Sequence, residues 1–84
     1  MKTEIKITMH NLKEERPQRS GEMICITKYG GLTSINYSYR WDSFNYRDSE
    51  ESMPDDGYRA EWDDYIVYWG YADSLKGKYV YETE

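Results

Sequence analysis

The chain has 84 residues, and its sixteen acidic and eleven basic side chains give a net charge of −5 at pH 7. This length allows one domain with one modest core, to which ten Tyr and three Trp must contribute most of the large apolar surfaces. The sequence lacks an apolar run long enough for a membrane helix or a signal peptide, and its one cysteine cannot form an internal disulfide. We therefore expect a single domain over residues 1–84, located in the cytoplasm.

Strand and turn signals open the chain. Apolar and polar residues alternate from Ile5 to Met9, which is the period of a strand with one buried face. The four residues from Asn11 have the spacing of a helix capping box, but Pro17 would end a helix after about one and a half turns. We expect a strand within residues 1–9, followed by a short helical turn or a loop.

The next segments predict a β-hairpin. Residues 22–27 are apolar on both faces, as in a central strand, and the glycines that follow tolerate the positive φ angles of a tight turn at 29–31. Residues 32–41 alternate again and predict the return strand, with aromatic residues on one face. Aromatic and β-branched side chains are expected to fill the core, among them Tyr37, Tyr39, Val67 and Trp69.

An acidic segment and further strand signals complete the pattern. Residues 45–60 combine acids with Ser, Asn, Pro and Gly, a composition typical of an exposed loop. Aromatic and β-branched residues predict strands at 65–69 and 79–81, with a turn over 72–77 between them. Since no long amphipathic helix is evident, the expected fold is all-β or β-rich α+β, a small antiparallel sheet or open barrel of about five strands with an acidic loop.

Short motifs lie at three places in residues 13–69: Glu14 to Pro17 followed by Gly21, then Tyr29-Gly30, and finally Ile66 to Trp69. Together they resemble a family of small phage and prophage domains of unknown function, in which a Glu-Arg-Leu-Pro…Gly segment precedes an apolar strand and a Val-Thr-His-Trp-Met-Pro segment closes the domain. Here the Leu before the proline is missing, and Gly70 follows the tryptophan where the family has Met-Pro. The resemblance implies a mobile-element origin and a small β-rich domain, without assigned catalytic residues.

Catalytic and metal-binding patterns are not evident in the sequence. Cys25 lies in an apolar run, where a cysteine is usually a small buried hydrophobe, and the lone His10 is not adjacent to it in the sequence. One Cys and one His leave a zinc site two ligands short. If Asp48 began a calcium-binding loop, Met53 would stand where that loop requires glycine. We expect a protein that is not an enzyme and that holds neither a metal nor another cofactor.

Acidic and aromatic residues alternate along residues 42–65. Nine acidic and two basic residues give residues 42–64 a net charge of −7. A net-negative chain is repelled by phosphates, so direct binding to DNA or RNA is not expected. Carboxylates on an exposed surface can instead take the places that phosphates would occupy in a basic groove, while Tyr and Trp anchor the interface.

The expected function is therefore protein binding. The chain would be a phage-type accessory protein that inhibits a nucleic-acid-binding host defence protein by mimicking nucleic acid, as small phage inhibitors, anti-CRISPR proteins among them, often do. Its partner would be a basic protein, and no membrane is involved. The expected contact residues are Asp48, Glu50, Glu51, Asp55, Asp56, Tyr58, Glu61, Trp62, Asp63 and Asp64.

Other interpretations of the same residues stay open. The rings could form a platform on which sugars or bases stack, and Trp41, Tyr58 and Trp62 are the candidates for such exposed use. The sheet edges could pair two copies of the chain in a structural subunit. The acids could also serve only to keep a loop solvated. The sequence fixes neither the oligomeric state nor the identity of the partner.

Overall fold

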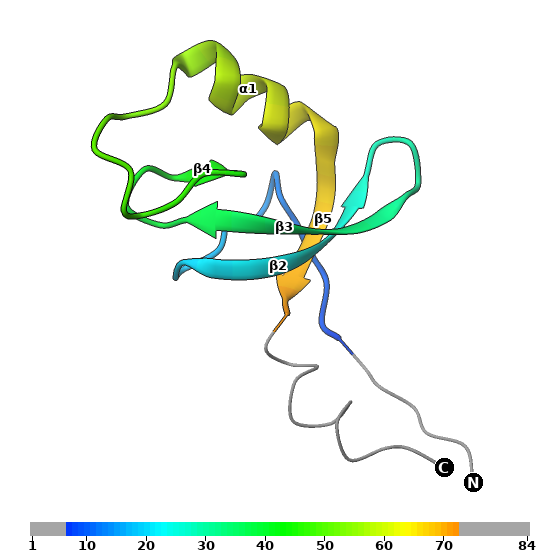
Figure 1. Cartoon of the computed structure of the whole chain (residues 1–84). Coiled ribbons are helices and arrows are strands. Elements are labelled where there is room, and N and C mark those ends of the chain that lie inside the picture. The colour runs from blue at the N-terminus through cyan, green and yellow to red at the C-terminus, as the bar shows by residue number, and fades with distance from the viewer. Residues whose placement is uncertain (1–6, 73–84) are drawn as a thin grey trace, which may run out of the picture.

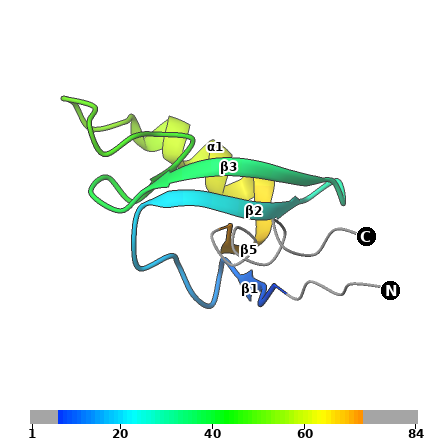
Figure 2. The same ribbon diagram turned by 60° about the horizontal axis from the view of Figure 1, so that its bottom comes forward.

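The computed structural model describes residues 7–72, which form a curled antiparallel sheet with one short helix (Figure 1). The sheet order is β1-β5-β2-β3-β4, and every neighbouring pair is antiparallel. Figure 2 shows the curl that carries the sheet from β3 through β2 and β5 to β1. The predicted β-rich fold with about five antiparallel strands is confirmed for these residues. The elements are β1 (His10–Asn11), β2 (Gly21–Thr27), β3 (Leu32–Ser38), β4 (Ser43–Phe44), α1 (Asp56–Tyr65) and β5 (Ile66–Tyr71).

The hairpin of β2 and β3 forms the centre of the sheet. Ile26 lies opposite Leu32 next to the turn. The Thr27 amide donates to the Gly31 carbonyl at 2.9 Å, and Gly30 has a φ of 84°, which glycine adopts without strain. Because β2 lies between β5 and β3, both the central strand and the turn predicted from the sequence are confirmed.

The return strand ends earlier than its alternating pattern predicts. β3 stops at Ser38, and Tyr39, which we expect in the core, lies in a turn with 54% of its surface exposed. The chain reverses at Asp42, whose φ of 51° an aspartate tolerates better than most residues. This reversal brings Ser43 back to pair with Ser38. The alternation of aromatic and polar residues, which runs on to Trp41, therefore continues beyond the end of β3.

The core lies on the face of the sheet that α1 borders. Tyr37 is 3% exposed and Trp69 is fully buried, as expected, and the Trp69 indole N–H donates to the Glu15 carbonyl at 2.8 Å. Val67 is only half-buried, because the register of β5 against β2 shifts at this point. The buried cluster consists of Leu12, Met23, Cys25, Ile35, Tyr37, Phe44, Ile66 and Trp69.

The expected exposed loop over residues 45–60 is wrong in its second half. Helix α1 begins at Asp56, after Asp55 with the extended backbone of an N-cap residue. The acid in its first turn suits the positive end of the helix dipole. Tyr58, Trp62 and Tyr65 recur at helical spacing, a period that the acid-rich composition hid.

The ends of the sheet also differ from the prediction. Residues 7–9 are not paired as a strand, and pairing begins at His10, opposite Trp69. The first half of the strand expected in residues 1–9 lies outside the described residues, as do the strand at 79–81 and all but the first residue of the turn over 72–77. The two-residue strands β1 and β4, which the sequence does not predict, complete the sheet.

Gly70 lies where residues 7–9 cross closest to β5. A Cβ atom there would stand 2.8 Å from the Thr8 carbonyl oxygen, so we expect Gly70→Ala to lower the free energy of unfolding by about 1–3 kcal/mol. A Cβ on Gly57 in α1 would meet nothing within 4 Å, so Gly57→Ala should raise it by up to about 1 kcal/mol. Urea denaturation measures both changes. A Gly70→Ala protein as stable as the wild type would contradict this packing of residues 7–9.

Candidate functional site

Five aromatic rings form a continuous row along α1, which we call the aromatic row. Ring centroids are 6.0 Å apart for Tyr46 and Tyr58, and 6.4 Å apart for Tyr58 and Trp62. The row continues with 5.6 Å from Trp62 to Tyr65 and 6.2 Å from Tyr65 to Tyr29. Tyr29 is 79% exposed and the other four rings are half-buried. The row therefore offers aromatic surface to solvent along its whole length.

Local contacts hold the row in place. The Tyr58 hydroxyl donates to the Asn45 carbonyl at 2.8 Å and accepts from the Asn45 side-chain amide at 3.1 Å. Asn45 has a φ of 57°, a turn conformation that asparagine tolerates. The Tyr46 hydroxyl donates to the Ser52 carbonyl at 2.6 Å. These bonds fasten the segment before α1 to the helix, so the row is built in the folded state.

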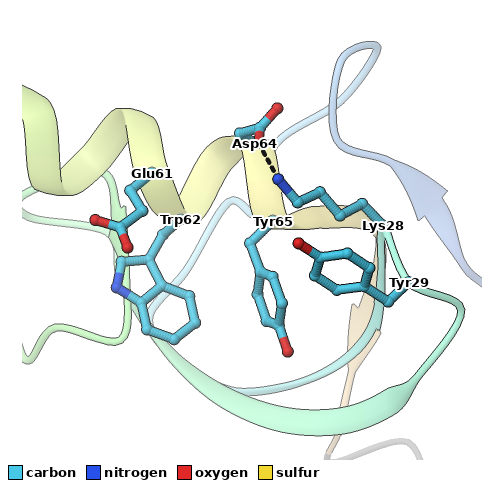
Figure 3. A pocket seen from close by; sticks show the side chains of 6 residues that line it. All are labelled: Lys28, Tyr29, Glu61, Trp62, Asp64 and Tyr65. Carbon is cyan, nitrogen blue, oxygen red and sulfur yellow. Dashed lines mark hydrogen bonds and ion pairs between the residues drawn. The ribbon is translucent and has the colours of Figure 1, made fainter.

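A hollow of about 380 Å³ opens between the C-terminal half of α1 and the β2–β3 turn (Figure 3). Figure 3 shows the rings of Trp62, Tyr65 and Tyr29 hanging into it from the helix and the turn. The Lys28 ammonium donates to the Asp64 carboxylate at 2.6 Å and lies 5.5 Å from the centre of the Tyr29 ring. This bond raises the pKa of Lys28 and lowers the pKa of Asp64. Carboxylates and ring faces together favour a cation here.

A second hollow of about 310 Å³ lies at the other end of the row. Its lining includes Tyr46 and Tyr58 of the row, Asn36 of β3, and the oppositely charged Arg47 and Glu50. The first hollow adjoins the turn where β3 begins, and the second reaches β3 near its end. The aromatic row thus runs beside β3 between two hollows, each lined by acidic and basic residues.

Five of the predicted acidic residues point outward. Asp56 has a side chain that is 98% exposed, with an Oδ1 oxygen 3.7 Å from the Arg59 guanidinium. The other four are exposed and make no side-chain hydrogen bond or ion pair within residues 7–72. They are Glu50, Glu51, Asp55 and Glu61.

The Asp48 carboxylate stabilises the fold through hydrogen bonds. Its carboxylate accepts hydrogen bonds from the Ser38 hydroxyl at 2.5 Å, from the Arg40 amide at 3.2 Å and from the Ser20 hydroxyl. The bonds from Ser20 and Ser38 hold the pKa of Asp48 below its ordinary value. Asp48 therefore ties the loop before α1 to the end of β3.

Asp63 binds Arg16, a partner that the sequence analysis did not predict. Arg16 donates to Asp63 at 3.1 Å and to Asp42 at 2.9 Å, and Asp42 also accepts from the Tyr37 hydroxyl. Burial acts to lower the pKa of Arg16, but the bonds to the two carboxylates outweigh it and raise that pKa. With Asp64 bound to Lys28, three of the eight predicted acids accept side-chain hydrogen bonds from other residues of the fold.

Sequence reasoning missed several residues of this site. Tyr46, Tyr65 and Tyr29 belong to the row, and Lys28 lines the first hollow. The spacing of Tyr58, Trp62 and Tyr65 is the signal that could have found the helical part. Tyr29 and Tyr46 come from separate turns, and only the folded chain brings them to α1.

The cysteine and the histidine, which are common catalytic and metal-binding residues, lie outside the aromatic row and its hollows. Cys25 is fully buried, and burial raises its pKa to about 12. His10 stacks on Trp69 with 4.6 Å between ring centroids, and its Nδ1 lies 3.0 Å from a Glu15 carboxylate oxygen. Within residues 7–72, no group of three or more His, Cys, Asp or Glu side chains could hold a metal ion. Over the same residues, no helix has the length and apolar character needed to cross a membrane.

Comparison of the chain with protein-family models, with curated proteins and with solved structures gives no match. The resemblance to small phage and prophage domains stays a prediction from the motifs. The function therefore has to be inferred from the aromatic row and the charges around it.

Cys25 should behave as a buried hydrophobic residue. Because its pKa is raised to about 12, only about one thiol in ten thousand is ionised at pH 8, and the thiolate is the reactive form. We expect iodoacetamide to leave Cys25 unmodified in the native protein and to modify it once denaturant unfolds the chain. Mass spectrometry of the two samples measures this. Rapid labelling of the native protein would contradict the burial of this thiol.

Asp48 should make stability depend on pH in the acid range. Because its folded pKa is lowered, Asp48 stabilises the fold fully above the ordinary carboxyl pKa of about 3.9, and this contribution disappears as pH falls through the folded value. Urea denaturation should therefore give a difference between wild type and Asp48→Asn that is largest at neutral pH and shrinks below about pH 4. The control Glu51→Gln removes an unpartnered acid and should lack this profile. A difference that stays constant down to about pH 2 would contradict the assignment.

Proposed function

We propose that the protein acts by binding a basic partner protein through the aromatic row and the acids beside it. The observation that supports this most is the row itself: its neighbouring rings are 5.6 Å to 6.4 Å apart, yet all five stay partly open to solvent. Exposed aromatic surface of this kind is typical of interaction sites, and Tyr and Trp are frequent interface anchors.

The charge around the row favours a partner rich in Lys and Arg. Glu50 lines the hollow at one end and Glu61 the hollow at the other, and within residues 7–72 neither carboxylate makes a hydrogen bond or a close ion pair. Such acids speed the encounter with a basic surface. Once the surfaces meet, cationic side chains can stack on the rings. Charge would thus mainly set the rate of association, and the rings would set the lifetime of the complex.

The partner we propose is a nucleic-acid-binding protein of the host, with the protein acting as an inhibitor in the bacterial cytoplasm. The phage-like motifs support this choice, and so does the concentration of outward acids on one segment. Mimicry of phosphates would fall to the outward acids, because Asp48, Asp63 and Asp64 already bind Ser, Arg and Lys side chains of the fold.

A flat platform for sugars or bases is less compatible with the rings. The planes of Trp62 and Tyr65 meet at 86°, and those of Tyr46 and Tyr58 meet at 65°. A planar ligand stacks on one face at a time and could not lie flat across such rings. Side chains of a protein partner can enter between them.

The proposal predicts different effects for charge and ring variants. After affinity capture of the partner from nuclease-treated bacterial lysate, Glu50→Gln with Glu61→Gln should slow association several-fold at low salt. Trp62→Ala should instead speed dissociation by roughly tenfold or more, as for a desolvated anchor. Surface plasmon resonance separates the two rates. Circular dichroism checks that each variant folds.

The matched control removes the same amount of charge at another place. Glu14→Gln with Glu15→Gln changes two acids that line neither hollow, and it should leave association unchanged. DNA or RNA should compete with the protein for the partner. If nucleic acid and the protein bind the partner together with undiminished affinity, mimicry is wrong. If the Glu50 and Glu61 changes have no effect, these acids only keep the surface solvated.

A further inference from the structure

β3 has a free edge. β4 pairs only with Tyr37 and Ser38, at the end of the strand. Because the Thr27 amide bonds to the Gly31 carbonyl, the alternation of an antiparallel pair directs the backbone groups of Leu32 and Ser34 away from β2. Within residues 7–72 these groups have no hydrogen-bond partner. They form an open template for another strand.

This free edge faces the aromatic row. In Figure 1, β3 lies between β2 and α1. β4 pairs with β3 on the side away from β2 and also packs against α1, so that side of β3 is the side toward the helix. Tyr29 marks the start of the edge at the first hollow, and Asn36 marks its end at the second. The backbone of Asn36 also points away from β2, as the alternation requires, since its carbonyl accepts a hydrogen bond from the Asn45 amide at 2.6 Å. The edge and the row therefore border the same space from two sides.

We propose that an extended segment of the partner adds to β3 as an antiparallel strand, pairs with the backbone of Leu32 and Ser34, and places Arg or Lys side chains on the aromatic row. This inference rests on the proposed function and specifies the chemistry of its partner. Strand addition is a recurring mode of peptide recognition, in which backbone bonds supply affinity and alternate side chains supply specificity.

The two faces of the added strand would differ. Side chains on the face of Thr33 and Ile35 point toward the core side, where Trp62 and Tyr65 pack. On that side Glu61 and Asp64 favour cations, and Lys28 already provides one example of a cation held there. We therefore place Arg or Lys at these alternate positions.

The opposite face favours apolar side chains. Leu32, Ile26 and Tyr68 lie side by side across β3, β2 and β5 on that face, and Leu32 is 72% exposed. The added strand would extend this apolar line by one position. The partner segment is thus amphipathic, with basic and apolar residues alternating.

A second copy of the chain is a poorer occupant of the edge. Pairing β3 with β3 would bring the acids beside the two aromatic rows close together, in a chain that already carries a net charge of −5. Like charges across an interface disfavour the contact. A basic segment has the complementary charge.

Three synthetic peptides test the proposal on the isotope-labelled full-length protein. The probe is Ac-Thr-Arg-Val-Arg-Val-Arg-Thr-NH2, compared with one copy N-methylated at both Val amides and one N-methylated at all three Arg amides. In an antiparallel pair, directly opposite residues share a face, so the Val amides would bond to Leu32 and Ser34 while the Arg amides would point away. NMR titration measures binding at the Leu32 and Ser34 amides and at the Trp62 indole.

The unmodified peptide and the Arg-methylated copy should bind alike, and the Val-methylated copy should bind at least about tenfold more weakly. Equal binding of all three peptides would overturn strand addition while leaving charge-based binding, and so the proposed function, intact. No binding of the unmodified peptide at about 1 mM would also overturn strand addition. The competition between nucleic acid and the captured partner then decides the proposed function separately.

A pair of protein variants repeats the test from the other side. Ser34→Pro removes the backbone donor on the open edge, where proline is tolerated, and Ser34→Ala keeps that donor. The proline variant should lose peptide binding by about tenfold or more, and the alanine variant should keep it. If Ser34→Pro does not fold, the methylated peptides still decide. A concentration-dependent dimer in sizing chromatography that Ser34→Pro abolishes would identify a second copy as the occupant and overturn the proposal.

Discussion

Arg16 holds the acidic half of the chain against the sheet. It comes from the segment after β1, while its two carboxylate partners come from the turn before β4 and from α1. A partly buried guanidinium needs such partners, and two carboxylates brought close together need a cation between them. This contact and the packing of Trp62 and Tyr65 against the core both hold one side of α1 toward the sheet. The same orientation leaves Tyr58, Trp62 and Tyr65 beside the free edge of β3.

The helix depends on cations from elsewhere in the chain. α1 has no basic residue in its last turn, and it carries Asp63 and Asp64 where the negative end of the helix dipole disfavours acids. Arg16 and Lys28 supply the missing positive charge from other segments. A helix of ten residues with this charge pattern has little stability by itself. The aromatic row therefore exists only when the whole sheet is folded.

The parts that were predictable from the sequence are those set by local pattern. Residues 22–27 and the glycine pair were enough to place the central strand and its turn, because period and turn chemistry act over a few residues. α1 was hidden because acids and a glycine at its start resemble a loop. The inward orientation of Asp63 could not be predicted either, since it depends on Arg16, which is distant in the sequence. The sequence treated the eight acids as one surface, and it could not separate the five that point outward from Asp48, Asp63 and Asp64, which bind side chains of the fold.

β4 covers only the end of β3, and this affects how the protein behaves in concentrated solution. An uncovered strand edge next to an exposed leucine is a nucleus for ordered aggregation, and natural proteins often guard such edges with charge. In this protein, repulsion between the acidic surfaces of two copies protects the edge. Acid or high salt removes this repulsion. The carboxylates that we propose to bind a basic partner would therefore also keep copies of the protein apart, and neutralising them would leave the β3 edge open to pairing with the β3 edge of another copy.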